Sequence, residues 1–238
     1  MKKDEKNESF TKIDELLDNG GYTLADYIEY YGQRKSKLLM MNDDSYNLFC
    51  NLYSDLLSNK YGQDEKGARL EELTALLFSK SVRNVFNVYR NCRTSTNEID
   101  LVISWTENAR LSGINNIYPC FGDYFLCECK NYKEPVTVTY IGKFCSLMSV
   151  SDINLGIMIS WEGISGRGKW DASKGLIKKV ALRENRYIIV IDKDDLKQIF
   201  EKQTNIFSLI YDKYLALKND IDYSKYIKKH GAQDIIRL

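Results

Sequence analysis

The order of secondary-structure patterns after residue 66 restricts the fold of this chain more than any other feature. Five segments have the alternation or the continuous apolar content of short β-strands: 85–92, 98–105, 124–130, 155–160 and 187–191. Four segments with apolar residues at helical spacing stand around them: 70–80, 140–150, 171–184 and 194–200. The order α-β-β-β-α-β-α-β-α predicts an α/β fold, with a mixed β-sheet flanked by helices.

The chain divides by pattern into three parts. Residues 1–62 form an N-terminal helical accessory segment, in which Asn19-Gly20-Gly21 ends a first helix and Thr23 with Asp26 forms a capping box for a second. A third helix is predicted over 45–59. Residues 63–203 form the α/β core, and 204–238 form a C-terminal helical extension rich in Tyr and Lys.

The histidine count excludes several kinds of chemistry. His230 is the single histidine among 238 residues. A metal site with two histidines is therefore impossible, and a serine or cysteine hydrolase would have to use His230 or none. The six cysteines contain no CxxC pair, which favours reduced core residues over disulfides or zinc ligands. An enzyme of this composition would work with carboxylates and lysines.

The location of the protein is predicted from what the chain lacks. It contains no apolar run of the roughly 20 residues that a membrane helix needs, and its first ten residues are charged, without the apolar centre of a signal peptide. We therefore expect a cytoplasmic protein with no membrane partner. The formal net charge of +1 neither requires nor excludes a nucleic-acid partner.

The third strand pattern carries the strongest candidate for chemistry. Side chains alternate between the two faces of a strand, so Glu128 and Lys130 emerge on one face and Cys127 and Cys129 on the other. The Cys129 carbonyl lies between the two charged residues. A carboxylate and an ammonium group two residues apart at a strand end can hold a metal ion and a lysine around one phosphate.

Asp100 supplies a second carboxylate on the preceding strand. Ile99 and Leu101 share a face, so Asp100 faces the other way, and an unpaired carboxylate in a buried strand is costly. A hard cation would remove that cost. Asp100, Glu128 and the Cys129 carbonyl offer the oxygen ligands that Mg²⁺ prefers, with Mn²⁺ as a substitute. Taken alone, Glu128 and Lys130 fit an ordinary ion pair at a solvated hairpin end better than they fit a metal site.

The order of these features over residues 66–200 resembles the PD-(D/E)XK nuclease superfamily, in particular its Mrr-like restriction endonuclease branch. The matching segments are Lys66 to Leu73, Glu98 to Val102, Glu128 to Asn131, Lys143 with Phe144 in the following helix, and the two strands at 156–160 and 188–192. The proline of the superfamily's name is absent, because Ile99 stands in its place.

The resemblance implies a role for each site residue. Asp100 and Glu128 are implied as metal ligands and Lys130 as the catalytic lysine. Glu71 is implied as a carboxylate that a helix contributes to the site. A helical wheel does not separate Glu71 from Glu72, so this choice follows from the superfamily pattern alone.

The function implied by the resemblance is Mg²⁺-dependent hydrolysis of DNA phosphodiester bonds, in restriction or defence against phage. DNA is the expected partner and RNA the less favoured substrate. A homodimer, or a partner subunit of a defence system, is left open. The alternative from another class is a catalytically silent nucleic-acid-binding or scaffold subunit, whose site would fail to bind metal.

A glycine-rich segment offers a further alternative. Gly163 to Lys169 has the spacing of a P-loop, which binds nucleotide phosphates through backbone N–H groups. Trp170, however, stands where a P-loop has the Ser or Thr that holds Mg²⁺. The segment is therefore a nucleotide-binding loop, a plain glycine loop, or a DNA contact in which Arg167 and Lys169 join Lys143 in binding phosphates.

Overall fold

The computed structural model describes residues 3–23, 26, 41–81, 85–93, 98–111, 113–166 and 172–226, and the chain forms two compact units, 1–40 and 41–238. In the first unit, helix α1 (Lys3–Gly20) ends where the sequence predicts, because Gly21 adopts a φ of 69° and donates its N–H to the Asp18 carbonyl at 3.1 Å. Thr23 and Asp26 form the predicted reciprocal capping bonds, at 2.7 and 3.2 Å.

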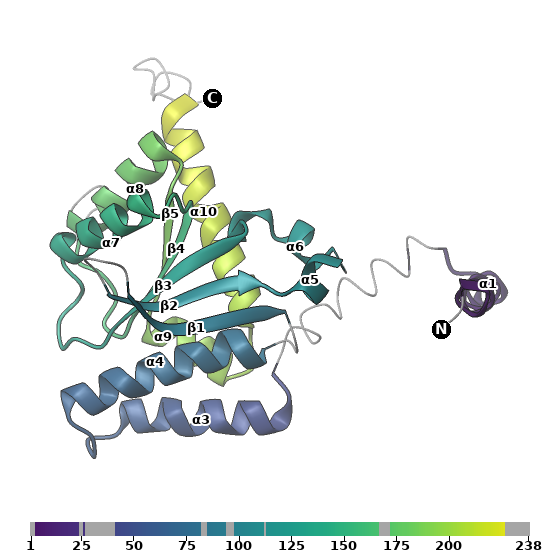
Figure 1. Cartoon of the computed structure of the whole chain (residues 1–238), viewed down its shortest axis with the longest axis horizontal. Coiled ribbons are helices and arrows are strands. Elements are labelled where there is room, and N and C mark those ends of the chain that lie inside the picture. Colours follow the sequence, from purple (N-terminus) through teal and green to yellow (C-terminus); the bar gives the residue numbers. More distant parts are fainter. Residues whose placement is uncertain are drawn as a thin grey trace, which may run out of the picture. The chain divides into compact units, whose positions relative to one another are not determined.

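The second unit contains a five-stranded sheet and the helices around it (Figure 1). The strands are β1 (Phe86–Arg93), β2 (Glu98–Trp105), β3 (Tyr124–Lys130), β4 (Leu155–Ser160) and β5 (Tyr187–Ile191). The helices are α3 (Asp43–Leu57), α4 (Gln63–Lys80), α5 (Glu107–Leu111), α6 (Ile114–Ile117), the 3₁₀ helix η1 (Pro119–Phe121), α7 (Val138–Val150), α8 (Ala172–Glu184), α9 (Lys193–Phe200) and α10 (Ile206–Tyr226).

The strand order is β1-β2-β3-β4-β5, so each strand pairs with its neighbour in sequence. The first two pairings are antiparallel and the last two are parallel. β1 and β2 form the predicted hairpin, in which Phe86 pairs with Trp105 and Arg93 with Glu98. The predicted mixed sheet flanked by helices is confirmed.

Side chains of β3 alternate between helices on the two faces of the sheet. Phe125 packs edge-on against Phe78 of α4, and the Cys129 thiol lies 3.4 Å from the Thr74 hydroxyl on the same helix. Leu126, between them, belongs to a buried apolar cluster on the other face, together with residues of α7 and α8. The sheet therefore has α4 on one face and α7 with α8 on the other.

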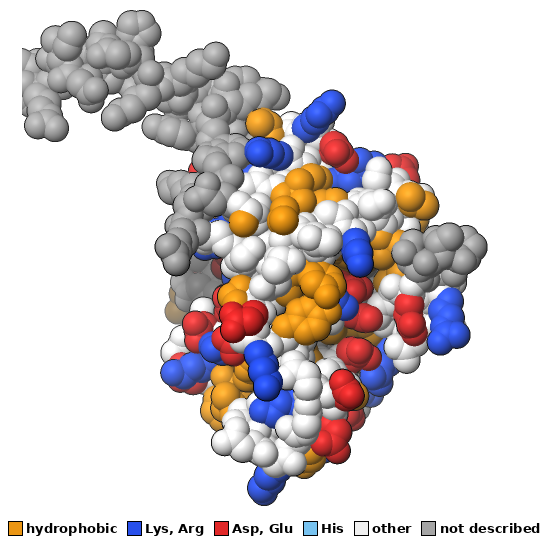
Figure 2. Space-filling model, turned by 90° about the vertical axis from the view of Figure 1, so that its left-hand side faces the viewer, with side chains coloured by type: hydrophobic (Ala, Val, Ile, Leu, Met, Phe, Trp, Pro, Cys, Tyr) orange, Lys and Arg blue, Asp and Glu red, His pale blue; other side chains and the backbone are white. Residues whose placement is uncertain are grey.

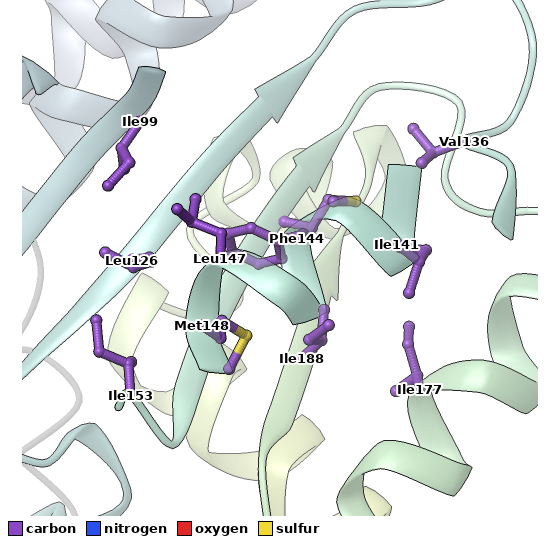
Figure 3. Close-up of a cluster of buried hydrophobic side chains, with 11 residues drawn as sticks. Ile99, Leu126, Val136, Ile141, Phe144, Leu147, Met148, Ile153, Ile177 and Ile188 are labelled. Carbon is purple, nitrogen blue, oxygen red and sulfur yellow. The ribbon is translucent and has the colours of Figure 1, made fainter. Parts of the chain in front are cut away.

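The apolar cluster under α7 fixes that helix against the sheet. Phe144 and Met148 of α7, Ile177 of α8 and Leu126 of β3 are all at most 5% exposed (Figure 3). α7 approaches β4 closely at Gly156, where a Cβ atom would stand 2.6 Å from both the Met148 sulfur and a Phe144 ring carbon. Only glycine fits there without a shift of these two side chains.

Helix α3 packs along α4 within the second unit (Figure 1). The Asn42 side chain caps its first turn by accepting the Ser45 N–H at 2.9 Å, and the Tyr53 ring stacks on Phe200 of α9 at 4.9 Å. The predicted division between residues 62 and 63 therefore falls inside a compact unit, which begins at Met41.

Two regions contain helices for which the sequence predicted no boundaries. α5, α6 and η1 fill the connection between β2 and β3, and α10 occupies most of the C-terminal extension, where it contacts β5 and α8. Among the helices described, none combines the length and apolarity needed to cross a membrane.

Candidate active site

The antiparallel pairing of β2 with β3 ends where the candidate carboxylates begin. The last paired residues are Leu101 and Cys127. Asp100, the residue before Leu101, replaces a backbone partner: its carboxylate oxygen Oδ2 accepts the N–H of Cys129, two residues after Cys127, at 2.7 Å. The two strands therefore separate at this end of the sheet, and a carboxylate occupies the fork.

Lys130 joins the two carboxylates. Its Nζ lies 2.6 Å from Glu128 Oε1 and 4.0 Å from Asp100 Oδ2. The three side chains are only 16% to 20% exposed, so water screens their charges weakly. The structure thus brings together the three residues that were placed at the centre of the site from the sequence.

The charges at this end of the sheet influence one another. Burial raises the pKa of Glu128, and the negative charge of Asp100 raises it further against the opposing effect of Lys130. Burial acts to lower the pKa of Lys130, but the charge and hydrogen bond of Glu128, with Asp100 behind it, outweigh burial and raise it. Lys130 therefore remains an ammonium ion at neutral pH.

Glu71 is the helix carboxylate that lies near this group. It is partly buried on α4, and burial raises its pKa, with a further rise from Asp100 and opposing effects from Arg90 and Lys130. Glu72 is exposed on the same helix. Glu71 therefore lies within electrostatic reach of Asp100.

The oxygen atoms at the fork match the preferences of a hard cation. A residue in a strand directs its N–H and C=O toward the same neighbour, so the Cys129 carbonyl faces β2 as its N–H does. Asp100, Glu128 and this carbonyl form an all-oxygen donor set. Within the described residues, no three His, Cys, Asp or Glu side chains cluster tightly enough to hold a metal ion by themselves.

A hollow of about 180 Å³ opens beside Glu128 and Lys130. Lys143 of α7 is exposed at its wall, with its Nζ 5.6 Å from the centre of the Tyr140 ring. Tyr140 and Glu98 also line the hollow, and no role was assigned to them from the sequence. Strand pairing could have indicated Glu98. If the antiparallel register of Leu101 with Cys127 is continued toward the end of the two strands, Glu98 falls opposite Lys130.

The glycine-rich segment uses its backbone differently from a P-loop. The Gly163 N–H donates to the Ser160 carbonyl and the Ser165 N–H to the Val136 carbonyl, both at 2.9 Å. These two groups are therefore not available to a nucleotide phosphate. Arg167 and Lys169, the predicted phosphate contacts, lie outside the described residues.

Comparison with known proteins gives one family and one solved structure. The family model Mrr_cat, described as restriction endonuclease, matches residues 63–200. The DNA modification-dependent restriction endonuclease AspBHI aligns with 79% of this chain at 12% identity and a TM-score of 0.37. The chain spans 42% of the length of AspBHI. A search of curated proteins gives no match.

The matched residues include all five strands and helix α4, and with them Glu71, Asp100, Glu128 and Lys130. They make up more than half of the chain. The chain belongs to the restriction endonuclease family.

Proposed function

We propose that this protein is an endonuclease that hydrolyses DNA phosphodiester bonds with the help of Mg²⁺, for which Mn²⁺ can substitute. The observation that carries the proposal is the position of Lys130 Nζ, 2.6 Å from Glu128 and 4.0 Å from Asp100, in a chain of the restriction endonuclease family. A pair of carboxylates beside a lysine at a strand end suits phosphate chemistry.

The donor set supports a divalent cation. Burial raises the pKa of Glu128, and repulsion by the charge of Asp100 raises it further; a cation between the two carboxylates would relieve that repulsion. Their carboxylates and the Cys129 carbonyl would hold the ion, and Glu71 would support it from α4. A cation bound there supplies positive charge for the scissile phosphate and lowers the pKa of the attacking water.

Lys130 acts in this proposal as a positive charge. Its raised pKa keeps the ammonium group protonated, so Lys130 suits the stabilisation of charge that develops on the phosphate oxygens. Water attacks phosphorus and releases a proton to solvent as the new P–O bond forms, the P–O bond to the departing oxygen breaks, and that oxygen takes up a proton. Glu128 holds the Lys130 side chain in position through their 2.6 Å contact.

Phosphate contacts around the site would bind the DNA. Lys143, exposed at the wall of the hollow beside Glu128 and Lys130, is the described residue best placed for one. Arg167 and Lys169 are proposed for the same task on the basis of the sequence. Membership of the restriction endonuclease family supports a role in restriction or defence against phage, and DNA in preference to RNA as the substrate.

The test is cleavage of supercoiled plasmid by the full chain, with Mg²⁺, with Mn²⁺ and with EDTA. Plasmid with and without methylated bases should be used, so that a requirement for modified DNA does not hide cutting. We expect divalent-dependent cutting that Asp100→Ala or Glu128→Ala abolishes. Full cutting in EDTA, or by either variant, would refute the metal-dependent mechanism.

A matched pair of variants on α4 tests the helix carboxylate. Glu71→Ala should reduce cutting, whereas Glu72→Ala removes an exposed carboxylate from the next position and should not. Wild-type protein that binds DNA but cuts neither plasmid under any condition would favour the catalytically silent DNA-binding subunit. Saturable ATP binding that Lys169→Ala removes would instead favour the nucleotide-binding alternative.

A further inference from the structure

A second and larger hollow, of about 400 Å³, lies beside the active site in the same compact unit. It forms where the α3–α4 connection meets the segments that follow β3 and β4. Tyr61, Tyr132 and Trp161 contribute aromatic surface to its wall. Its volume falls in the range of about 300–1,000 Å³ that is typical of sites for small molecules.

The wall of this hollow carries excess positive charge. Lys66 and Lys133 line it, and neither forms an ion pair with a described residue. Glu162 is the one acidic residue among the described residues of the wall, and its carboxylate lies 2.6 Å from Lys193 Nζ. Two lysines with no ion-pair partner in the described part of the chain, beside aromatic rings, form a surface suited to an anion that carries a flat ring.

Backbone and ring contacts link the wall of this hollow to the candidate active site. The backbone N–H of Trp161 donates to the Lys130 carbonyl at 3.1 Å, and Tyr132 follows Lys130 by two residues. The Tyr132 ring lies 5.2 Å from the ring of Tyr140, which lines the first hollow. The chain from Lys130 to Tyr132 spans at most about 7 Å, the length of two extended residues. That length is about twice the rise per nucleotide along one strand of a duplex.

The connection between α3 and α4 lies at the left of Figure 1, and Figure 2 looks onto that side. Acidic and basic side chains are mixed across this face, with apolar side chains in patches between them. The described part of this face has no broad surface of a single charge sign (Figure 2). Such a surface would bind a duplex along its length by charge alone. Local charge at the hollow is therefore the better candidate for a phosphate contact.

We propose that the second hollow receives one unpaired nucleotide of the DNA strand, next to the bond that is cut. Its base stacks on Tyr132 above a floor formed by Trp161, and its phosphate lies between Lys66 and Lys133. A base within a duplex cannot enter such a hollow, so the nucleotide must leave the stack or come from a single-stranded region. This inference rests on the proposed nuclease function, because it names the substrate of the same site.

The test is binding of a fluorescein-labelled oligothymidylate to the full chain in EDTA, measured by fluorescence anisotropy over a range of salt concentrations. Tyr132→Ala should weaken binding about tenfold, the loss of one stacked base. Lys66→Ala and Lys133→Ala should each reduce the salt slope of binding by about 0.7, as expected for one phosphate contact on a single strand. Duplex with one central mismatch should respond to Tyr132→Ala more strongly than fully paired duplex.

Lys60→Ala is the matched control, because Lys60 is exposed next to Tyr61 but does not line the hollow. Binding by the three variants within twofold of wild type, or equal weakening by Lys60→Ala, would overturn the proposal. The proposal would also be overturned if the protein is a dimer that Tyr132→Ala dissociates while oligonucleotide binding stays unchanged. The hollow would then be a contact between two copies of the chain. The binding assay contains no divalent ion and does not measure cutting. A failure of DNA cutting would therefore contradict the proposed nuclease function without changing the result of the binding assay, so the two proposals can fail separately.

Discussion

One face of β3 changes from apolar core to candidate active site within two residues. Leu126 is 1% exposed in the apolar cluster under α7. Glu128, the next residue on that face, is 17% exposed and lies 2.6 Å from Lys130. The same strand therefore has an apolar half that packs against α7 and a charged half that faces a hollow.

The two halves contribute to stability in opposite directions. Burial of the apolar half stabilises the fold through the hydrophobic effect and close packing. Burial of the charged half raises the pKa of Glu128, which means that folding disfavours its ionised form. A rigid apolar cluster thus holds charged groups in an arrangement that they would not maintain alone, as preorganised sites require.

A variant that disrupts the apolar cluster should have the largest effect on the stability of the fold. Phe144→Ala deletes a ring at the centre of the cluster and should destabilise the protein by about 3–5 kcal/mol. For a chain of this length each kcal/mol lowers the Tm by about 2–4 °C, which thermal unfolding followed by circular dichroism can resolve. Val150→Ala, at the exposed end of the same helix, is the control and should change the Tm little. A loss below about 1 kcal/mol for Phe144→Ala would contradict the importance of the cluster.

Removing the positive charge of Lys130 should act mainly on cutting. Lys130→Met keeps the length of the side chain and should reduce the rate of cutting by about 10²–10³ at saturating DNA, or about 2.7–4 kcal/mol in the barrier. Lys143→Met, at the wall of the same hollow, should weaken DNA binding and leave that rate within about tenfold. Equal rates for wild type and Lys130→Met would remove Lys130 from the mechanism.

A variant of β4 tests how closely α7 must approach the sheet. Gly156→Ala introduces a methyl group 2.6 Å from the Met148 sulfur and should destabilise the protein by about 1–3 kcal/mol. Combining it with Phe144→Ala, which removes the other close neighbour, should make the added cost of Gly156→Ala smaller than it is alone. Chemical denaturation of the four proteins gives that comparison. Strictly additive effects would mean that the close approach is not the cause.

The strands could be predicted from the sequence because their patterns are local. The bounds of β2, β3, β4 and β5 agree with the predicted segments, since alternation and short apolar runs mark them directly. Helix α4, by contrast, begins at Gln63 and not at residue 70. Its first turns are polar, and their stability depends on Glu65 accepting the Gly62 N–H, a contact that apolar spacing does not reveal.

The site was predictable in its residues and less so in its geometry. Strand alternation placed Glu128 with Lys130, but the bond from the Cys129 N–H to Asp100 depends on where β2 and β3 stop pairing. The choice between Glu71 and Glu72 depends on how α4 is rotated against the sheet. The second hollow joins three connections that are distant in sequence, so only the tertiary structure brings its aromatic rings and lysines together.

The smallest effect should come from Glu71, whose contribution to stability should change with pH in a direction that its raised pKa predicts. Burial raises the pKa of Glu71 above its ordinary value of 4.5, so the folded protein binds this proton more tightly than the unfolded chain does. Its contribution to stability is therefore full below that value and is lost as pH rises through the folded pKa. Glu71→Gln removes this loss, so in EDTA the variant should gain stability relative to wild type as pH rises above about 4.5, by less than about 1 kcal/mol after solvent screening. Thermal unfolding at several pH values measures the difference, and Glu72→Gln, on the exposed side of α4, should show none. A Glu71→Gln protein that loses stability relative to wild type as pH rises would show that the positive charges of Arg90 and Lys130, and not burial, dominate at this position.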